Sequence, residues 1–306
     1  MNLARRSFLK IIPAAGILAA CGRGNKTRLA LNWKPDPEFG GFYAADYAKH
    51  GLDVDILPGG AGTPTVQMVG AGSAEFGIVS ADEILLARAQ GNDVVALFAA
   101  FQNNPQGIMA HASRKLESIS DVLKSGTLAL QSGLPYARLL QKKFGFDHVK
   151  VVPSPGGDLT AFFNDPNFAQ QCFVTEEPLQ AKRRGVEVTV FPIAETGYNP
   201  YTTVLAASGD LLRKNPEMAT RMVAAVREGW RTYLDNAAPT NERMYALNPT
   251  MDKATFSEVA EAQKRLIEST PLGKMTTERW STLASQLKDL GDIPEAPPAD
   301  QCFRDL

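Results

Sequence analysis

The feature that most constrains the fold is a strand–loop–helix–strand unit in residues 28–56. Residues 28–31 form a short apolar run, as in a buried strand. Pro35 ends this strand, because proline cannot donate to a ladder and favours an extended residue before it. Gly51 closes the following helix, and residues 52–56 alternate like a second strand. In an open α/β sheet, such a unit predicts a ligand site at the carboxyl end of its first strand. The apolar positions of the helix recur at helical spacing: Phe42, Tyr43, Tyr47 and Ala48.

Repetition of this pattern predicts two α/β lobes. Apolar runs interrupted by polar, Gly- and Pro-containing stretches occur at 94–111 and 192–206, and we interpret them as crossings between lobes. We expect lobe 1 to comprise residues 28–112 and 204–306, and lobe 2 to comprise residues 113–203. The last part of lobe 1 is predicted to be mainly helical, with a loosely attached tail after Pro294.

Residues 1–20 read as a targeting segment rather than as part of the fold. Arg5 and Arg6 precede an apolar stretch that is too short to span a bilayer. The run around them resembles a twin-arginine export signal, and residues 18–21 resemble a lipobox ending in Cys21. We expect Cys21 to be lipidated and residues 21–27 to be a tether, which places the protein in the periplasm or on the cell surface. An ordinary signal peptide is the alternative.

Composition disfavours several classes of function. The formal net charge of −1 gives no basic excess for a nucleic-acid surface. The three cysteines form no CxxC pair and the three histidines form no HExxH motif, so we expect neither a metal site nor a bound cofactor. No nucleophile–base pair is visible, and we predict that the protein is not an enzyme. For Cys172 and Cys302, buried thiols and a disulfide both remain open.

Polar residues at a second strand end have two interpretations. Residues 75–79 read as a strand, and Ser80 and Asp82 follow it at the start of a helix. Either residue caps the helix by accepting from its free backbone N–H groups, or it faces a cleft. Capping is the interpretation we favour, and Ser80 is kept as a candidate ligand contact.

Several motifs resemble a known family of transport receptors. Leu31-Asn32-Trp33-x-Pro35, followed by Gly41-Phe42-Tyr43-Ala44-Ala45, resembles the pyrimidine-precursor branch of periplasmic binding proteins. This branch resembles the fungal thiamine-pyrimidine synthases and is more distantly similar to nitrate, sulfonate and taurine receptors. The resemblance covers roughly residues 28 to 290. Its further motifs are Gly51-Leu52-x-Val54, Phe76-Gly77-Ile78, Ala87-Arg88-Ala89-x-Gly91, Gln102-x-x-Pro105-x-Gly107 and Thr175-x-Glu177-Pro178.

The resemblance implies a periplasmic binding protein-like fold with a ligand cleft between the lobes. It also implies a monomeric solute receptor that captures a thiamine-type aminopyrimidine or another small heterocycle for the permease of an ABC transporter. Trp33 and Tyr43 are candidate stacking faces, or else core residues. Asp36 and Glu177 are candidate acceptors for the amine and ring nitrogen.

One assignment within that site stays open, namely which of two neighbouring acids faces the cleft. Glu177 is either a ligand acceptor or a helix-start acid, and Glu176 is the alternative acceptor. Tyr198 and Tyr201, near the second crossing, are expected to close over the ring.

The chain also departs from these relatives. The fungal synthases use a cysteine-rich motif and a consumed histidine, whereas Cys172 stands alone here, so synthase activity does not carry over. The alternatives are a receptor for a sulfonate, a flavin precursor or another aromatic compound, and an enzyme acting on a pyrimidine.

Overall fold

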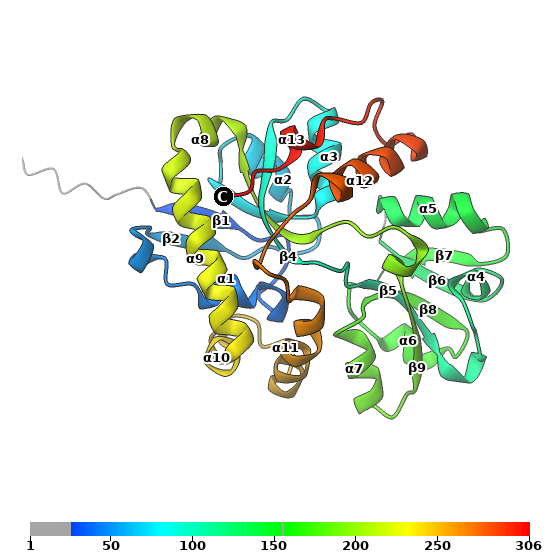
Figure 1. The fold of residues 1–306 in the computed structure, drawn as a ribbon. Helices are drawn as coiled ribbons and strands as arrows, with labels where there is room; N and C mark the ends of the chain where they lie inside the picture. Colours follow the sequence, from blue (N-terminus) through cyan, green and yellow to red (C-terminus); the bar gives the residue numbers. More distant parts are fainter. Residues whose placement is uncertain (1–25, 132, 155) are drawn as a thin grey trace, which may run out of the picture.

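The protein consists of two α/β lobes that lie side by side (Figure 1). The computed structural model describes residues 26–131, 133–154 and 156–306. The sheet of lobe 1 has the order β2-β1-β3-β10-β4, and that of lobe 2 the order β7-β6-β8-β5-β9. Strands β10 and β5 are antiparallel to both of their neighbours. The strands are β1 (Thr27–Ala30), β2 (Val54–Leu57), β3 (Phe76–Val79), β4 (Val94–Phe101), β5 (Gln106–His111), β6 (Thr127–Leu130), β7 (Lys150–Pro153), β8 (Phe168–Phe173), β9 (Val188–Pro192) and β10 (Thr202–Ser208).

Helices cover both sheets, and most of them belong to lobe 1 (Figure 1). Lobe 1 carries α1 (Gly40–Ala44), α2 (Thr65–Gly70), α3 (Ala81–Ala89), α8 (Gly209–Lys214), α9 (Pro216–Asp235), α10 (Ala238–Leu247), α11 (Lys253–Ile267), α12 (Thr277–Leu290) and α13 (Ala299–Cys302). Lobe 2 carries α4 (Ile119–Val122), α5 (Pro135–Phe144), α6 (Thr160–Asn164) and α7 (Glu177–Arg183). Short 3-10 helices complete the chain: η1 (Pro37–Phe39), η2 (Ala48–His50), η3 (Ala112–Arg114) and η4 (Ile193–Thr196). None of the described helices is both long enough and apolar enough to span a bilayer.

The chain passes between the sheets twice. It leaves lobe 1 between β4 and β5, and it returns between η4 and β10. Residues 106–111 therefore belong to the sheet of lobe 2, where β5 pairs with β8 and β9, whereas the sequence analysis assigns them to lobe 1. The difference arises because β4 and β5 are both buried, so one apolar run covers two strands of different sheets.

The predicted helix over residues 42–48 forms two short pieces, α1 and η2. Helix α1 lies very close to α9, because residues 40 and 41 are glycines. A Cβ atom on Gly41 would lie 2.2 Å from the ring of Trp230, and one on Gly40 would lie 2.2 Å from the ring of Tyr233. The buried aromatic side chains of α9 thus pack directly on the backbone of α1 and fix where the loop after β1 enters the helix.

The carboxyl-terminal tail packs on lobe 1, so the prediction that it is loosely attached is wrong. The backbone N–H of Arg304 donates to Ala96 O of β4 at 2.9 Å, next to a parallel bridge between Ala96 and Phe303. The Phe303 ring stacks on Trp280 of α12, with centroids 6.0 Å apart. Cys302 is fully buried in α13. Apolar contact and sheet pairing therefore hold a segment whose Pro- and acid-rich composition resembles a linker.

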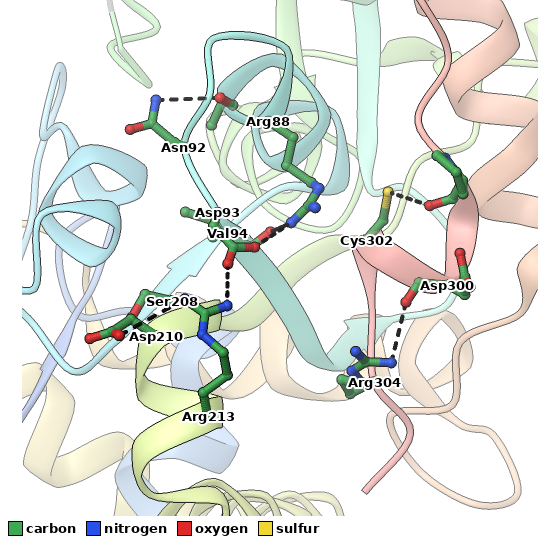
Figure 2. Close-up of polar contacts among 12 residues, drawn as sticks. Arg88, Asn92, Asp93, Val94, Ser208, Asp210, Arg213, Asp300, Cys302 and Arg304 are labelled. Atoms are coloured by element: carbon green, nitrogen blue, oxygen red, sulfur yellow. Dashed lines mark hydrogen bonds and ion pairs between the residues drawn. The ribbon is translucent and has the colours of Figure 1, made fainter.

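Ion pairs join the strand and helices near this tail (Figure 2). Asp93, just before β4, forms an ion pair with Arg88 of α3 at 3.0 Å and another with Arg213 of α8 at 2.8 Å. These guanidinium groups lower the pKa of Asp93.

Cys172 of β8 and Cys302 of α13 are free thiols in different lobes. The predicted leader, tether and lipidated Cys21 lie outside the described residues, apart from the tether's last two positions.

Candidate ligand-binding cleft

The loop after β1 presents acids toward lobe 2 from a firmly held backbone. Asp36 caps η1, and its Oδ1 accepts from the backbone N–H of Glu38 at 3.0 Å. Asn248, after α10, donates to the carbonyl of Pro35 at 2.8 Å. Gln263 of α11 donates to the carbonyl of Pro37 at 2.7 Å. The prolines on both sides of Asp36 have no N–H to pair, but their carbonyl groups still need donors. The side-chain amides of Asn248 and Gln263 supply these donors.

Lobe 2 contributes two acids at the junction of β8 and α7. Glu176 is the residue before the helix, and Glu177 is its first residue, with Pro178 next. Glu177 Oε2 accepts from the backbone N–H of Phe173 at 2.8 Å. Glu176 Oε1 accepts from the side chain of Gln180 at 3.3 Å. Both carboxyls are therefore oriented by their own lobe.

A glycine turn after β7 lies between the two lobes. Gly156 and Gly157 have φ of +67° and +94°, in the region that favours glycine. A Cβ atom on Gly156 would lie 3.8 Å from Trp33 Cη2 of lobe 1. One on Gly157 would lie 3.8 Å from Glu177 Oε1. Consecutive positions of one turn thus lie near Trp33 and near Glu177, so the predicted aromatic face and the predicted acceptor flank the same turn.

Four carboxyls meet here, and we call Asp36, Glu38, Glu176 and Glu177 the acidic cluster. Burial is the main cause that raises the pKa of each. It raises that of Glu38 to about 8 and that of Glu177 to about 7. The carboxyls of Glu176 and Glu177 raise the pKa of Glu38 further, across the lobe boundary. Lys34 acts in the opposite direction on Asp36 and Glu176. The arrangement favours a ligand that brings positive charge or N–H donors.

Thr203 supports the acidic cluster from a strained backbone. Its φ is +52°, a conformation that a β-branched residue rarely adopts and that costs about 1–3 kcal/mol. It lies between Thr202, which pairs with Phe101, and Val204 in β10. Its hydroxyl lies near Glu38 and lowers the pKa of that carboxyl. Sequence reasoning missed both Glu38 and Thr203, although the acid of Pro37-Glu38 was visible two residues from Asp36.

Tyr43 lies beside the acidic cluster. Its side chain is buried at 5% exposure, and its hydroxyl oxygen has no hydrogen-bond partner among the described residues. Burial and the nearby charge of Asp36 raise the pKa of the phenol to about 12. The ring packs in the core of lobe 1, so the position supports a polar contact through the hydroxyl better than a stacking face.

Tyr198 and Tyr201 are structural, contrary to the expectation that they close over a ring. Tyr198 is fully buried and donates to Asp82 Oδ2 at 2.8 Å. The Tyr201 hydroxyl accepts from the backbone N–H of Thr276 at 3.1 Å, and the Arg279 guanidinium lies 3.9 Å from its ring centroid. Their structural role could not be inferred from their position next to a crossing, because β10, α3 and α12 also pack together at that crossing.

Ser80 acts as a helix cap. It forms a capping box with Glu83, whose Oε2 accepts from the Ser80 backbone N–H at 2.7 Å. The Ser80 hydroxyl also donates to Asp82. The favoured interpretation of the sequence therefore agrees with the geometry. Within the described residues, no group of His, Cys, Asp and Glu has an arrangement that could hold a metal ion.

Comparison with known proteins gives a family, two relatives and a fold. The family model described as NMT1/THI5 like matches residues 36–239. The riboflavin-binding protein RibY of Chloroflexus aurantiacus is 27% identical over 226 residues, which are 68% of this chain and 62% of the relative. The chain thus spans less than two thirds of that relative's length. A formylaminopyrimidine-binding protein of Halalkalibacterium halodurans is 22% identical over 286 residues, with 87% of this chain and 86% of the relative covered.

Solved structures agree on the fold. The aliphatic sulphonate binding protein SsuA of Escherichia coli superposes with a TM-score of 0.71 at 14% identity, covering 92% of each chain. A Candida albicans protein described as having the generic periplasmic binding protein fold superposes with a TM-score of 0.61 at 14% identity, covering 92% of this chain and 97% of that one. The chain therefore has the two-lobed fold of periplasmic binding proteins, as the resemblance implies.

Proposed function

This chain belongs to the NMT1/THI5-like family, and we propose that it is the solute-binding receptor of an ABC importer. It captures a small heterocycle of the thiamine aminopyrimidine type between its lobes and delivers it to a membrane permease. The observation that carries this proposal is the acidic cluster, which draws Asp36 and Glu38 from one lobe and Glu176 and Glu177 from the other, beside Trp33.

An aminopyrimidine matches this arrangement in shape and in polarity. Its flat ring stacks on Trp33, which is partly exposed at the boundary between the lobes. Its exocyclic amine donates to Glu177 and Asp36, with Glu176 as the alternative acceptor. Because the acceptors belong to both lobes, the ligand makes its full set of contacts only when the lobes close, which couples binding to closure.

We propose a binding role rather than an enzymatic one. The two relatives described above are named as binding proteins, although a structural neighbour is a desulfurization enzyme. The raised pKa of the Cys172 thiol, caused mainly by burial, keeps this group in the unreactive thiol form. Incubation of the mature protein with an aminopyrimidine is expected to return the compound unchanged, as measured by liquid chromatography and mass spectrometry. Turnover would contradict a pure receptor.

A flavin-type ligand is the second candidate, because RibY is named as a riboflavin-binding protein and aligns with 68% of this chain. A sulfonate fits less well, since the acidic cluster would repel an anion. Protein purified from its own periplasm and examined by native mass spectrometry is expected to retain its ligand and reveal the mass.

Calorimetry with 4-amino-5-hydroxymethyl-2-methylpyrimidine tests the proposal directly. We expect binding that Glu177→Gln weakens about 10- to 100-fold, because a hydrogen bond to a charged group is worth about 1.5–3 kcal/mol. Trp33→Ala should weaken it through lost stacking. Glu195→Gln, at an exposed position of η4, is the matched control and should bind like the parent. If neither the pyrimidine nor riboflavin binds, the assigned ligand classes are wrong.

We also propose that the mature protein is a monomeric lipoprotein, exported by the twin-arginine route and anchored through Cys21. The export route and the anchor rest on the sequence of residues 1–27. Cys21→Ala is expected to release the protein from the membrane fraction and to abolish palmitate labelling. Light scattering of the released protein should give the mass of one chain.

A further inference from the structure

We infer that the cleft accepts its ligand as a planar cation of the amidinium type, and that it discriminates against neutral and anionic molecules of the same shape. The inference rests on the proposed function, because it concerns the same cleft. It narrows the ligand from a small heterocycle to a charged class, and it assigns the discrimination to Glu38.

The first step is the balance of charge between the lobes. Asp36 and Glu38 lie across the lobe boundary from Glu176 and Glu177. Glu177 raises the pKa of Asp36, Glu176 and Glu177 raise that of Glu38, and Asp36 raises that of Glu176. Lys34 is the cation that opposes Asp36 and Glu176, and its Nζ is also shared with Thr250 Oγ1 at 3.4 Å. Burial and mutual repulsion favour the protonated form of these carboxyls in the empty cleft, and a cation bound between the lobes would stabilise their charged form and with it the closed state.

The second step concerns buried polar oxygen atoms that have no hydrogen-bond partner among the described residues. The Tyr43 hydroxyl is buried beside Asp36 and has no partner among the described residues. Asn32 Oδ1, one residue before Trp33, is also buried without a described partner. An unpaired buried polar atom costs free energy, so the Tyr43 hydroxyl beside Asp36 marks a place where a hydrogen bond to a ligand is expected.

An amidinium group supplies what these residues lack. It is planar, it carries one positive charge, and its N–H bonds point outward in parallel pairs that match carboxylates. A neighbouring aromatic ring stacks on Trp33, and the cation gains from the face of the indole. A sulfonate offers only acceptors, and a neutral carboxamide offers half the donors and no charge.

Glu38 is the residue that makes the cleft selective for charge. Glu177 and Asp36 already accept backbone hydrogen bonds from Phe173 and Glu38, which orient them toward a ring. Glu38 instead lies near the hydroxyl of Thr203, whose φ of +52° is a strained conformation. Such strain persists where the surrounding structure enforces it, and it occurs preferentially at ligand sites. The acidic cluster has four carboxyls, which is more than the donors of a neutral aminopyrimidine can engage.

The test compares benzamidine with benzamide, which share one shape and differ in charge. Calorimetry on the mature protein at neutral pH is expected to give at least about tenfold tighter binding of benzamidine, and no binding of benzenesulfonate. Glu38→Gln should reduce the ratio of the two affinities severalfold, whereas Glu38→Asp should restore it. Glu195→Gln is the control, and circular dichroism reports whether each variant folds.

The outcomes separate this inference from the proposed function. If the aminopyrimidine probe binds while benzamidine shows no advantage over benzamide, the charged class is overturned and the receptor remains. If benzamidine is favoured and no aminopyrimidine binds, the charge selectivity stands and the proposed ligand falls. If none of these compounds binds, both are rejected. An unchanged ratio in a folded Glu38→Gln variant removes the role of Glu38.

Discussion

At the scale of single residues, the acidic cluster works against the stability of the empty protein. Burial raises the pKa of Glu38 from 4.5 to about 8 and that of Glu177 from 4.5 to about 7. A carboxyl whose pKa is higher in the folded state binds more protons there than in the unfolded chain. Its contribution to stability is complete below the unfolded value and is lost as pH rises through the folded value. The carboxyls proposed to bind the ligand thus make the stability of the ligand-free protein depend on pH.

We therefore predict that the ligand-free protein is less stable at pH 8 than at pH 5.5. Thermal unfolding should show a melting temperature lower by about 5 °C or more at the higher pH, since one kcal/mol shifts it by about 2–4 °C in a chain of this size. Glu38→Gln should raise the melting temperature at pH 8 and flatten the dependence. Asp252, whose pKa is lowered to about 2, loses its stabilisation at much lower pH and does not mask the effect. A melting temperature that stays constant or rises between these pH values would refute it.

Single residues also mark how far sequence reasoning reached into the site. Trp33 and Glu177 were predictable, because each follows a strand of an α/β lobe at the end where ligands bind. Glu38 was missed because an acid after a proline also reads as an ordinary helix start. Tyr198 was placed wrongly because its hydroxyl is used by Asp82, a residue more than a hundred positions away. Periodicity reports burial, but it does not report which buried hydroxyl is already paired.

At the scale of elements, the packing of α1 on α9 connects the fold to the site. Helix α1 follows directly on η1, which Asp36 caps, so a shift of α1 moves the acid-bearing loop. Gly229 of α9 meets Gly41 in the same contact, and a Cβ on Gly229 would lie 2.2 Å from the Gly41 carbonyl oxygen. The sequence predicted a helix here from the spacing of Phe42 and Tyr47, but close contact between backbones depends on glycines in two distant segments.

Gly41→Ala is therefore expected to destabilise the protein by about 1–3 kcal/mol, because the added methyl group overlaps the Trp230 ring in a filled core. Denaturation in urea measures the loss. Gly60→Ala is the matched control, since a Cβ at Gly60 would meet nothing within 4 Å. The two variants should differ in their denaturation midpoints but not in the urea dependence of the free energy. Equal midpoints would mean that the contact relaxes without cost.

At the scale of the whole molecule, one arginine holds both crossings against lobe 1. Arg279 of α12 donates from Nε to Asn199 O at 2.7 Å and from Nη2 to Pro200 O at 3.2 Å. It also donates to Gln102 O, in the first crossing. Because Arg279 engages both segments, it ties both crossings to α12. Two further contacts between the lobes can be followed in Figure 1, α12 against α5 and α11 against α7.

Lobe organisation was predictable from the repeated strand and helix pattern, whereas the contacts between lobes were not. The acids of the cluster lie about 140 positions apart in the chain, at Glu38 and Glu176, and only the fold brings them together. Likewise, α7 begins with Glu177 and ends with Arg183, so one rigid helix carries an acidic cluster residue and a cation. Any contact of Arg183 with lobe 1 therefore positions Glu177 in the cleft.

The ion pairs of Arg183 with Asp252 and Glu258, which we call the clasp, join α7 to α11 and lead to a prediction about closure. Arg183 Nη1 lies 2.8 Å from Asp252 Oδ1, and its Nε lies 3.6 Å from Glu258 Oε2. These ion pairs join lobe 2 to lobe 1, and an opening that separates α7 from α11 would break them, so we expect them to stabilise the closed state. Because the pairs are partly exposed, their combined value is about 1 kcal/mol. Arg183→Ala should therefore weaken ligand binding about fivefold, mainly through faster dissociation.

Stopped-flow fluorescence of the indole at Trp33 measures this dissociation rate, and small-angle scattering measures the population of open molecules without ligand. Lys182→Ala, an exposed neighbour on the same helix, is the control for changes in α7 itself. High salt should reduce the difference between the parent and Arg183→Ala, because it screens exposed ion pairs. If Arg183→Ala and Lys182→Ala dissociate at the same rate, closure does not depend on the clasp, and the ligand in the acidic cluster must hold the lobes together by itself.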